Sequence, residues 1–155
     1  MFDLERFTRA QDSRWGFTSA LAEIKAGRKR SHWIWYIFPQ LKGLGSSSQA
    51  QTFGLDGLEE TFAYLQDATL RERLLTITAA VAAKLKTTAL ETLMGSEIDA
   101  LKLISSMTLF SYAAQQRYQA EGLADYETLS VLAKEILAVA RGQGYQPCSF
   151  TLSQL

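Results

Sequence analysis

The sequence predicts an all-α protein, a compact multi-helical single domain of about seven helices joined by short loops. Apolar residues recur at the spacing of amphipathic helices along most of the 155-residue chain. Ser, Thr or Asp precedes most of these stripes, where it can cap a helix. Only two prolines, Pro39 and Pro147, interrupt the pattern. The length suits one domain over residues 1–155, with residues 143–155 as an irregular C-terminal tail.

The first two predicted helices are short. Residues 4–11 form one of them. Ser13 can cap the second, which Gly27 ends. The apolar residues of the second helix fall at i, i+3, i+4 and i+7, and they are Phe17, Ala20, Leu21 and Ile24.

The next two predicted helices follow one another directly. Asp56 and Glu59 have the spacing of a capping box. The apolar face behind them is formed by Leu58, Phe62 and Leu65. Asp67 can start the following helix, which has a very regular stripe. That stripe consists of Leu70, Leu74, Ile77, Val81 and Leu85.

Three more helices complete the prediction. Thr88 and Glu91 repeat the capping-box spacing before a short helix that Gly95 ends. Ser96 can open another helix, which carries Leu101, Ile104, Met107 and Phe110. The last helix has Asp125 as its predicted cap and Gly142 as its end.

Composition excludes several classes of protein. Sixteen basic and 16 acidic residues give no net charge, which argues against a duplex-DNA binder. The N-terminus lacks the apolar region of a secretory signal, and no apolar run could span a membrane. One cysteine, Cys148, and one histidine permit neither an intrachain disulfide nor a multi-histidine metal site. We therefore expect a cytoplasmic protein with no metal and no cofactor.

One stretch has an unusual composition. From Ile24 to Leu55 the chain has five bases and no acid, so this part has a formal charge of +5 and the remainder −5. The same stretch holds the single histidine, His32, two of the three tryptophans and four of the ten glycines. Cations and free backbone N–H groups can hold an anion, and aromatic faces can stack on a flat ring.

A purely structural interpretation of this stretch stands beside the functional one. The aromatic residues of HWIWYIF (32–38) can be core, in a short buried strand or a helical turn. Residues 28–30 can be a solvated turn after a helix end. In the following GLGSSS, Gly43 and Gly45 allow close approach of a ligand, and Ser46 or Ser47 can cap a short helix. That motif is also typical of a simple turn.

Residues 102–110 form a second candidate block. Lys102, Ser105 and Ser106 share one face of a predicted helix, with Thr108 one turn on. Hydroxyl groups in a helix interior need partners. They can bond to carbonyl groups one turn earlier or allow tight helix packing, or they can meet residues 28–48 to complete a pocket.

The segments GRKRSHWIWYIFPQLKGLGSSSQAQ and LKLISSMTLF resemble the bacterial family called domain of unknown function 1810, whose members are sometimes labelled calpastatin-like. The resemblance covers nearly the whole chain and implies a mainly α-helical single domain with no established activity. The chain has Gln66-Asp67 where the family often has His-Pro. The family's motif residues are here Arg28, Lys29, Ser31, His32, Trp33, Trp35, Phe38, Pro39, Gln40, Gly43, Gly45, Ser46, Lys102, Ser105, Ser106, Met107, Thr108 and Phe110.

Two functions fit these residues. In the first, residues 28–48 and 102–110 build a pocket that binds or processes an anionic, nucleotide-like or sugar-phosphate small molecule. His32 is the candidate catalytic acid–base group, for hydrolysis or transfer at a phosphate ester or N-glycosidic bond. The candidate ligand-binding residues are Arg28, Lys29, Arg30, Ser31, Trp33, Trp35, Tyr36, Gln40, Gly43, Gly45, Ser46, Lys102, Ser105, Ser106 and Thr108.

In the second, the protein is a non-enzymatic interaction module. Its basic-aromatic segment, residues 25–42, docks an acidic protein surface or single-stranded RNA. A charge-driven interface should weaken steeply with salt, whereas an enclosed pocket should respond less.

Overall fold

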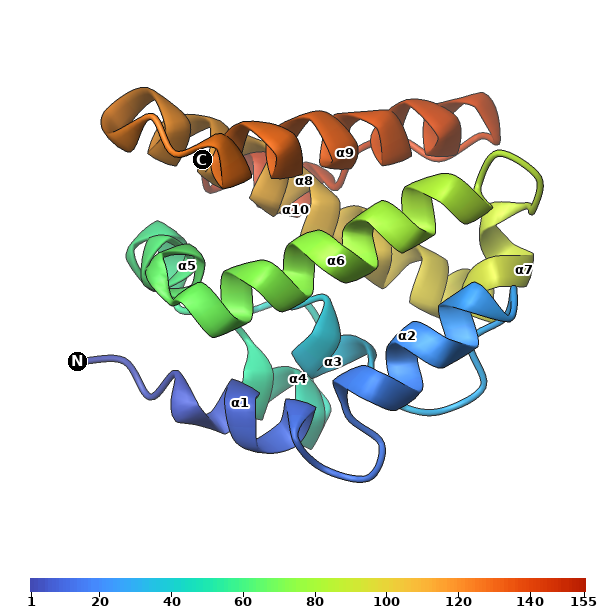
Figure 1. Ribbon diagram of the computed structural model, residues 1–155, viewed down its shortest axis with the longest axis horizontal. Coiled ribbons are helices and arrows are strands. Elements are labelled where there is room, and N and C mark those ends of the chain that lie inside the picture. The colour runs from blue at the N-terminus through green and yellow to red at the C-terminus, as the bar shows by residue number, and fades with distance from the viewer.

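The computed structural model describes residues 1–155 and contains ten α-helices and no strand (Figure 1). The all-α prediction is confirmed, but the predicted number of about seven helices is wrong. The helices are α1 (Glu5–Gln11), α2 (Phe17–Lys25), α3 (Ile34–Ile37), α4 (Ser48–Phe53), α5 (Gly57–Gln66), α6 (Ala68–Lys84), α7 (Leu90–Met94), α8 (Glu97–Glu121), α9 (Ala124–Gly142) and α10 (Ser149–Ser153).

The three helices beyond the predicted seven are α3, α4 and α10. Each has four to six residues, which is too short to show a helical period in the sequence. The aromatic segment HWIWYIF thus forms a helical turn, α3, rather than a strand. Ser47 caps α4 by accepting from the N–H of Ala50 at 3.1 Å. The tail after residue 143 is not wholly irregular, because it contains α10.

Several predicted helix ends are confirmed. Asp67 caps α6 by accepting from the N–H of Leu70 at 3.0 Å. Ser96 caps α8 by accepting from the N–H of Asp99 at 3.1 Å. Gly95 ends α7 in the left-handed conformation, with φ of +83°.

Other predicted caps are wrong. Residue Ser13 donates to the carbonyl of Ala10, and α2 starts after Gly16 instead. Asp125 lies inside the first turn of α9 and pairs with Arg71 at 3.2 Å. Local spacing cannot distinguish a cap from a first-turn residue, since both positions favour the same side chains.

The two predicted capping boxes are also wrong. The N–H of Asp56 is satisfied by Glu60 at 2.8 Å, one position beyond the predicted Glu59. At α7 the N–H of Leu90 donates to Gln143 Oε1 at 2.9 Å, from 53 residues away. The contact between Leu90 and Gln143 depends on tertiary packing, so the local sequence around Leu90 does not indicate it.

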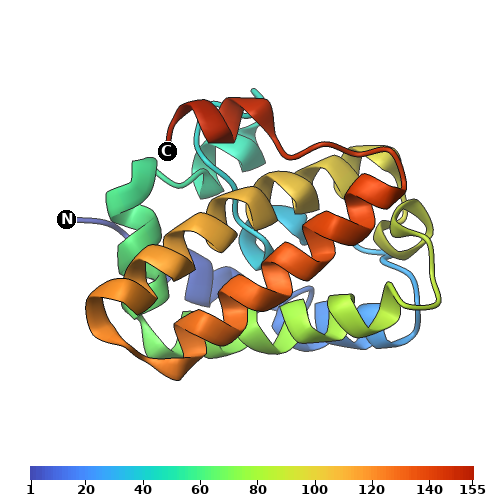
Figure 2. The same cartoon turned by 90° about the horizontal axis from the view of Figure 1, so that it is seen from above.

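The longest helices, α8 and α9, lie side by side as an antiparallel hairpin (Figure 2). Helix α6 packs against α9 on one side and α2 on the other, while α1 to α4 form the lower part of the molecule in Figure 1. One hydrophobic core joins these elements and includes Trp33 and Tyr64. No helix is both long and apolar enough to cross a bilayer.

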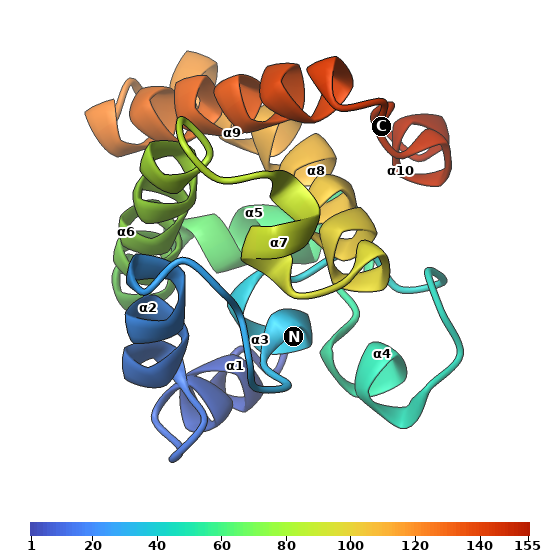
Figure 3. The same cartoon turned by 90° about the vertical axis from the view of Figure 1, so that its right-hand side faces the viewer.

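The packing places the two candidate blocks together. The segment from α2 to α3 passes beneath α7, and α3 packs against α8 (Figure 3). Helix α10 also packs against α8. Residues 28–38 therefore meet the N-terminal half of the longest helix.

Candidate functional site

The segment between α2 and α3 points its side chains alternately outward and inward. Arg28, Arg30 and His32, the outer row, are exposed. Lys29 and Trp33 point inward, with only 6% and 0% of their surface exposed. Such a period of two is typical of extended backbone. The structure thus separates the predicted site residues of this segment into two sets that face different ways.

Glu23, near the end of α2, holds this segment in place. Its Oε1 accepts from the backbone N–H groups of Arg30 at 2.7 Å and Ser31 at 2.9 Å, and from Trp33 Nε1 at 2.9 Å. Its Oε2 accepts from the Ser31 hydroxyl at 2.6 Å. Burial opposes ionisation, but these hydrogen bonds outweigh it and lower the pKa of Glu23 to about 2. Sequence reasoning missed Glu23, which lies outside the basic stretch.

Lys29 is a buried cation held by several contacts. Its Nζ lies 2.7 Å from Asp99 Oδ2, donates to the carbonyl of Ser31, and lies 4.9 Å from the centre of the Trp33 ring. Its backbone N–H donates to Leu93 at 2.7 Å. Lys29 therefore ties the segment to both α7 and α8.

Lys102 shares the same carboxylate. Its Nζ is 3.9 Å from Asp99 Oδ1 and 5.4 Å from the centre of the Trp35 ring. Its side chain is 23% exposed, against 4% for the side chain of Lys29. We call these five residues, Lys29, Trp33, Trp35, Asp99 and Lys102, the lysine–tryptophan cluster. Asp99 was not predicted, although it lies on the predicted helix.

Two buried polar atoms on the helices that carry this cluster have no hydrogen-bond partner. They are Nε1 of Trp35, on α3, and the hydroxyl oxygen of Ser106, on α8. Buried polar groups are normally hydrogen-bonded, so both atoms have unused capacity for a ligand or water. Trp35 belongs to the first predicted block, residues 28–48, and Ser106 to the second, residues 102–110.

The other hydroxyl groups of the second block have structural partners. Ser105 donates to the carbonyl of Leu101 at 3.0 Å, and Thr108 to that of Ile104 at 2.7 Å. Thr108 also accepts from the N–H of Cys148 at 3.1 Å, which attaches the start of α10 to α8. The back-bonding interpretation is therefore confirmed for Ser105 and Thr108.

The remaining predicted residues have mostly local contacts. The Tyr36 hydroxyl donates to the carbonyl of Trp15 at 2.5 Å, and Gln40 Nε2 donates to that of Leu44 at 3.1 Å. Gly43 packs against the ring of Phe150. Gly45 and Ser46 lie exposed in the same loop.

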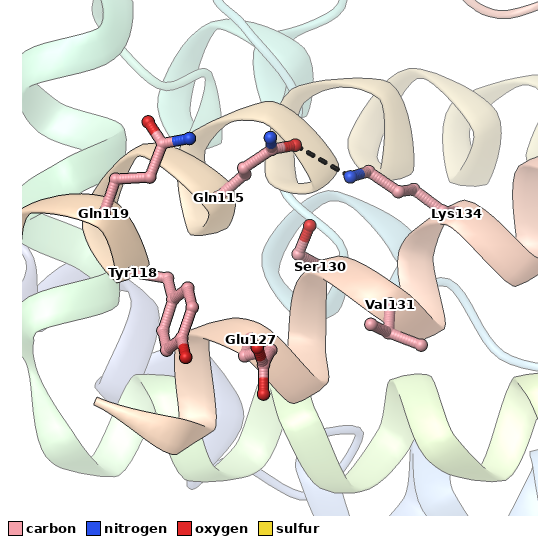
Figure 4. Close-up of a pocket in the computed structure, with 7 residues that line it drawn as sticks. All are labelled: Gln115, Tyr118, Gln119, Glu127, Ser130, Val131 and Lys134. Atoms are coloured by element: carbon pink, nitrogen blue, oxygen red, sulfur yellow. Dashed lines mark hydrogen bonds between the residues drawn. The ribbon is translucent and has the colours of Figure 1, made fainter. Parts of the chain in front are cut away.

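The principal cavities lie away from the lysine–tryptophan cluster. One of about 330 Å³ is lined by side chains of α8 and α9 (Figure 4), and sequence reasoning did not identify it. Its residues lack any unusual spacing or composition along the chain. No three His, Cys, Asp or Glu side chains are grouped closely enough to hold a metal ion.

The fold and the cluster define a small all-α protein whose basic, aromatic motif packs against its longest helix. The chain matches the model of the DUF1810 family, described as a protein of unknown function, over residues 1–130. It belongs to this family, as the resemblance implied.

A crystal structure from Mycobacterium tuberculosis, described as the conserved hypothetical protein Rv1873 at 1.38 Å, is similar to this chain. The two are 36% identical, with a TM-score of 0.77, over 99% of this chain and 96% of that one. The comparison with curated proteins gave no match.

Proposed function

We propose that the protein binds an anionic small molecule at the lysine–tryptophan cluster. The observation that carries this proposal is that the ammonium groups of Lys29 and Lys102 share the Asp99 carboxylate, so these three groups together have a formal charge of +1. Lys29 is closer to Asp99 and nearly fully buried, so the excess charge belongs to Lys102. A partly buried charge without full compensation is stabilised by an anion.

The neighbouring groups favour a ligand that also carries a ring or hydroxyl groups. The Trp35 ring beside Lys102 offers an apolar face, and its Nε1 is an unused donor. Ser106 can donate or accept a further hydrogen bond. These groups support a nucleotide-like or sugar-phosphate ligand, with its phosphate at Lys102. Roles for Gly43, Gly45 and Ser46 as ligand contacts, and for His32 as a catalytic group, stay predictions.

The test is thermal unfolding with inorganic phosphate, ribose 5-phosphate, ADP and ADP-ribose. A specific ligand at 100 times its Kd adds about 2.7 kcal/mol to the free energy of unfolding, so Tm rises clearly. Lys102→Gln should remove this response. Lys86→Gln is the matched control, because Lys86 is exposed and forms no ion pair. If no compound raises Tm, or if both variants respond like the wild type, the proposal is wrong.

A second candidate function, docking of an acidic protein surface, rests on the outer row. The guanidinium groups of Arg28 and Arg30 form no ion pair within the chain. Because Glu23 fixes the backbone here, these cations stand on a rigid support. The rings of Trp33, Tyr36 and Phe38 are buried, and the half-buried Trp35 ring lies beside Lys102 rather than in the outer row. This favours carboxylates over the stacked bases of single-stranded RNA.

Fluorescence anisotropy with labelled polyglutamate and oligouridylate tests this candidate. Polyglutamate should bind, weaken steeply with salt, and lose binding in the double variant Arg28→Ala/Arg30→Ala. Lys102→Gln should not change this binding, which separates it from the first candidate. Binding of oligouridylate alone, or of neither polymer, would contradict the acidic-protein interpretation.

A further inference from the structure

The cavity between α8 and α9 has a carboxylate at one end and an ammonium group at the other. Glu127 and Lys134 both lie on α9 and line this cavity. They are seven residues apart, so they share a helix face and are separated by about 10.5 Å along the helix axis. The two side chains form no ion pair with each other.

Each charge has only a neutral partner in the protein. Lys134 Nζ donates to Gln115 Oε1 at 2.7 Å, as Figure 4 shows. The Glu127 carboxylate interacts with the Tyr118 hydroxyl and raises the pKa of Tyr118. Neither side chain belongs to an ion pair. The cavity is thus neutral overall, with its positive and negative groups at separate ends.

Two amide side chains line the α8 wall of the cavity (Figure 4). Gln115 and Gln119 lie four residues apart on α8, on one helix face and about 6 Å from each other. The Gln119 side chain forms no hydrogen bond within the chain, and the Gln115 side chain uses only its oxygen. A side-chain amide can donate and accept, so it matches a peptide group. Peptide groups two residues apart in an extended chain are about 6.8 Å apart, close to the glutamine spacing.

We propose that the α8–α9 cavity binds a short zwitterionic peptide in an extended form. The free amino group lies at Glu127, the free carboxylate at Lys134, and the peptide groups face Gln115 and Gln119. Three extended residues span about 10 Å, which matches the axial separation of Glu127 and Lys134 along α9. The cavity volume of about 330 Å³ also suits a small ligand rather than a folded partner. This site shares no residue with the lysine–tryptophan cluster, so it does not depend on the proposed function.

The test uses NMR titration of the full chain with four probes. They are triglycine, N-acetyltriglycine, triglycinamide and glycine. Triglycine should cause saturable shifts in the amides of residues 115–134. It should bind about tenfold more tightly than the acetylated or amidated forms, each of which lacks one charged end. Glycine is too short to reach both charges and should bind more weakly still.

Two variants test which residue binds each charged end of triglycine. In Glu127→Gln, triglycine and N-acetyltriglycine should bind equally, because the amino group has lost its partner. In Lys134→Gln, triglycine and triglycinamide should bind equally. Glu135→Gln is the matched control on α9, since Glu135 is exposed and does not line this cavity. It should leave all four affinities unchanged.

Three outcomes would overturn the proposal. One is the absence of saturable shifts with triglycine. Another is equal binding of triglycine, its acetylated form and its amidated form, since the charges would then not be recognised. The third is equal binding of glycine and triglycine, which would rule out the spacing argument. The comparison among probes uses the wild type and does not depend on how any variant folds.

Discussion

At the scale of single residues, the two lysines that share Asp99 differ in role. Lys29 is nearly buried and also bonds to the carbonyl of Ser31. Loss of one partner of a buried ion pair leaves the other charge unpaired, at a cost of about 3–5 kcal/mol. Lys102 is farther from Asp99 and more exposed, so its substitution should affect binding more than folding. Lys102 is therefore the informative position for function, and Lys29 is mainly structural.

The lowered pKa of Glu23 predicts that its contribution to the free energy of unfolding depends on pH. In the unfolded chain its carboxyl has an ordinary pKa of 4.5, and in the folded chain the pKa is about 2. The folded state thus favours the charged form, and this stabilisation is complete above the unfolded pKa and lost as pH falls toward the folded one. We expect Glu23→Gln to cost about 1–3 kcal/mol near neutral pH. The difference from the wild type should shrink at about pH 3.

Urea denaturation at the two pH values measures this difference. Ser19→Ala is a control on the same helix, because Ser19 bonds only to the nearby carbonyl of Arg14. An equal difference between Glu23→Gln and the wild type at both pH values would show that the ionised carboxylate is not the stabilising form.

At the scale of secondary-structure elements, Gly95 connects the end of α7 to the basic segment. It has a φ of +83°, and a Cβ there would lie 2.7 Å from the carbonyl oxygen of Lys29. Gly122, at the end of α8, has a similar φ of +73° but faces open space. The two positions share the same backbone strain and differ only in the close contact.

We expect Gly122→Ala to cost about 1–2 kcal/mol from the left-handed conformation alone. Gly95→Ala should cost a further 1–3 kcal/mol or so, because the backbone of Lys29 has to shift. Chemical denaturation of both variants gives the two free energies. Equal costs would mean that the Lys29 backbone shifts freely to make room for the new Cβ. That result would contradict the conclusion that Glu23 holds this segment in place.

At the scale of the whole molecule, the basic motif and the hydrophobic core are joined through Trp33. Its ring is fully buried in the core cluster, and its Nε1 donates to Glu23 at 2.9 Å. A truncation here affects both the core and the outer row. The motif is therefore part of the cooperative unit rather than an attached loop.

Trp33→Ala should lower the free energy of unfolding by about 3–5 kcal/mol. Trp15→Ala is the control, because Trp15 is 51% exposed and should change stability by about 0.5 kcal/mol or less. Calorimetry should show one transition for each variant, with a large drop in Tm only for Trp33→Ala. Two separate transitions would show that the motif unfolds independently of the core.

The helical nature of the protein could be predicted from the sequence because it depends on local properties. Apolar stripes at helical spacing and caps such as Asp67 and Ser96 act within a few residues. The family could be identified because the aromatic-basic motif is long and unusual in composition. The short helices α3, α4 and α10 were beyond this reasoning, because they contain too few residues to show a period.

Only the tertiary structure decided which predicted site residues act together. Composition alone grouped Arg28, Lys29 and Arg30, but in the folded chain Lys29 points inward and its two neighbours are exposed. Asp99 pairs with Lys29 from 70 positions along the chain, and Gln143 caps α7 from 53 positions away. Such contacts come from helix packing, which spacing along a sequence does not record. The local sequence thus determined the elements and the composition of the motif, and packing determined its charge balance and its exposure.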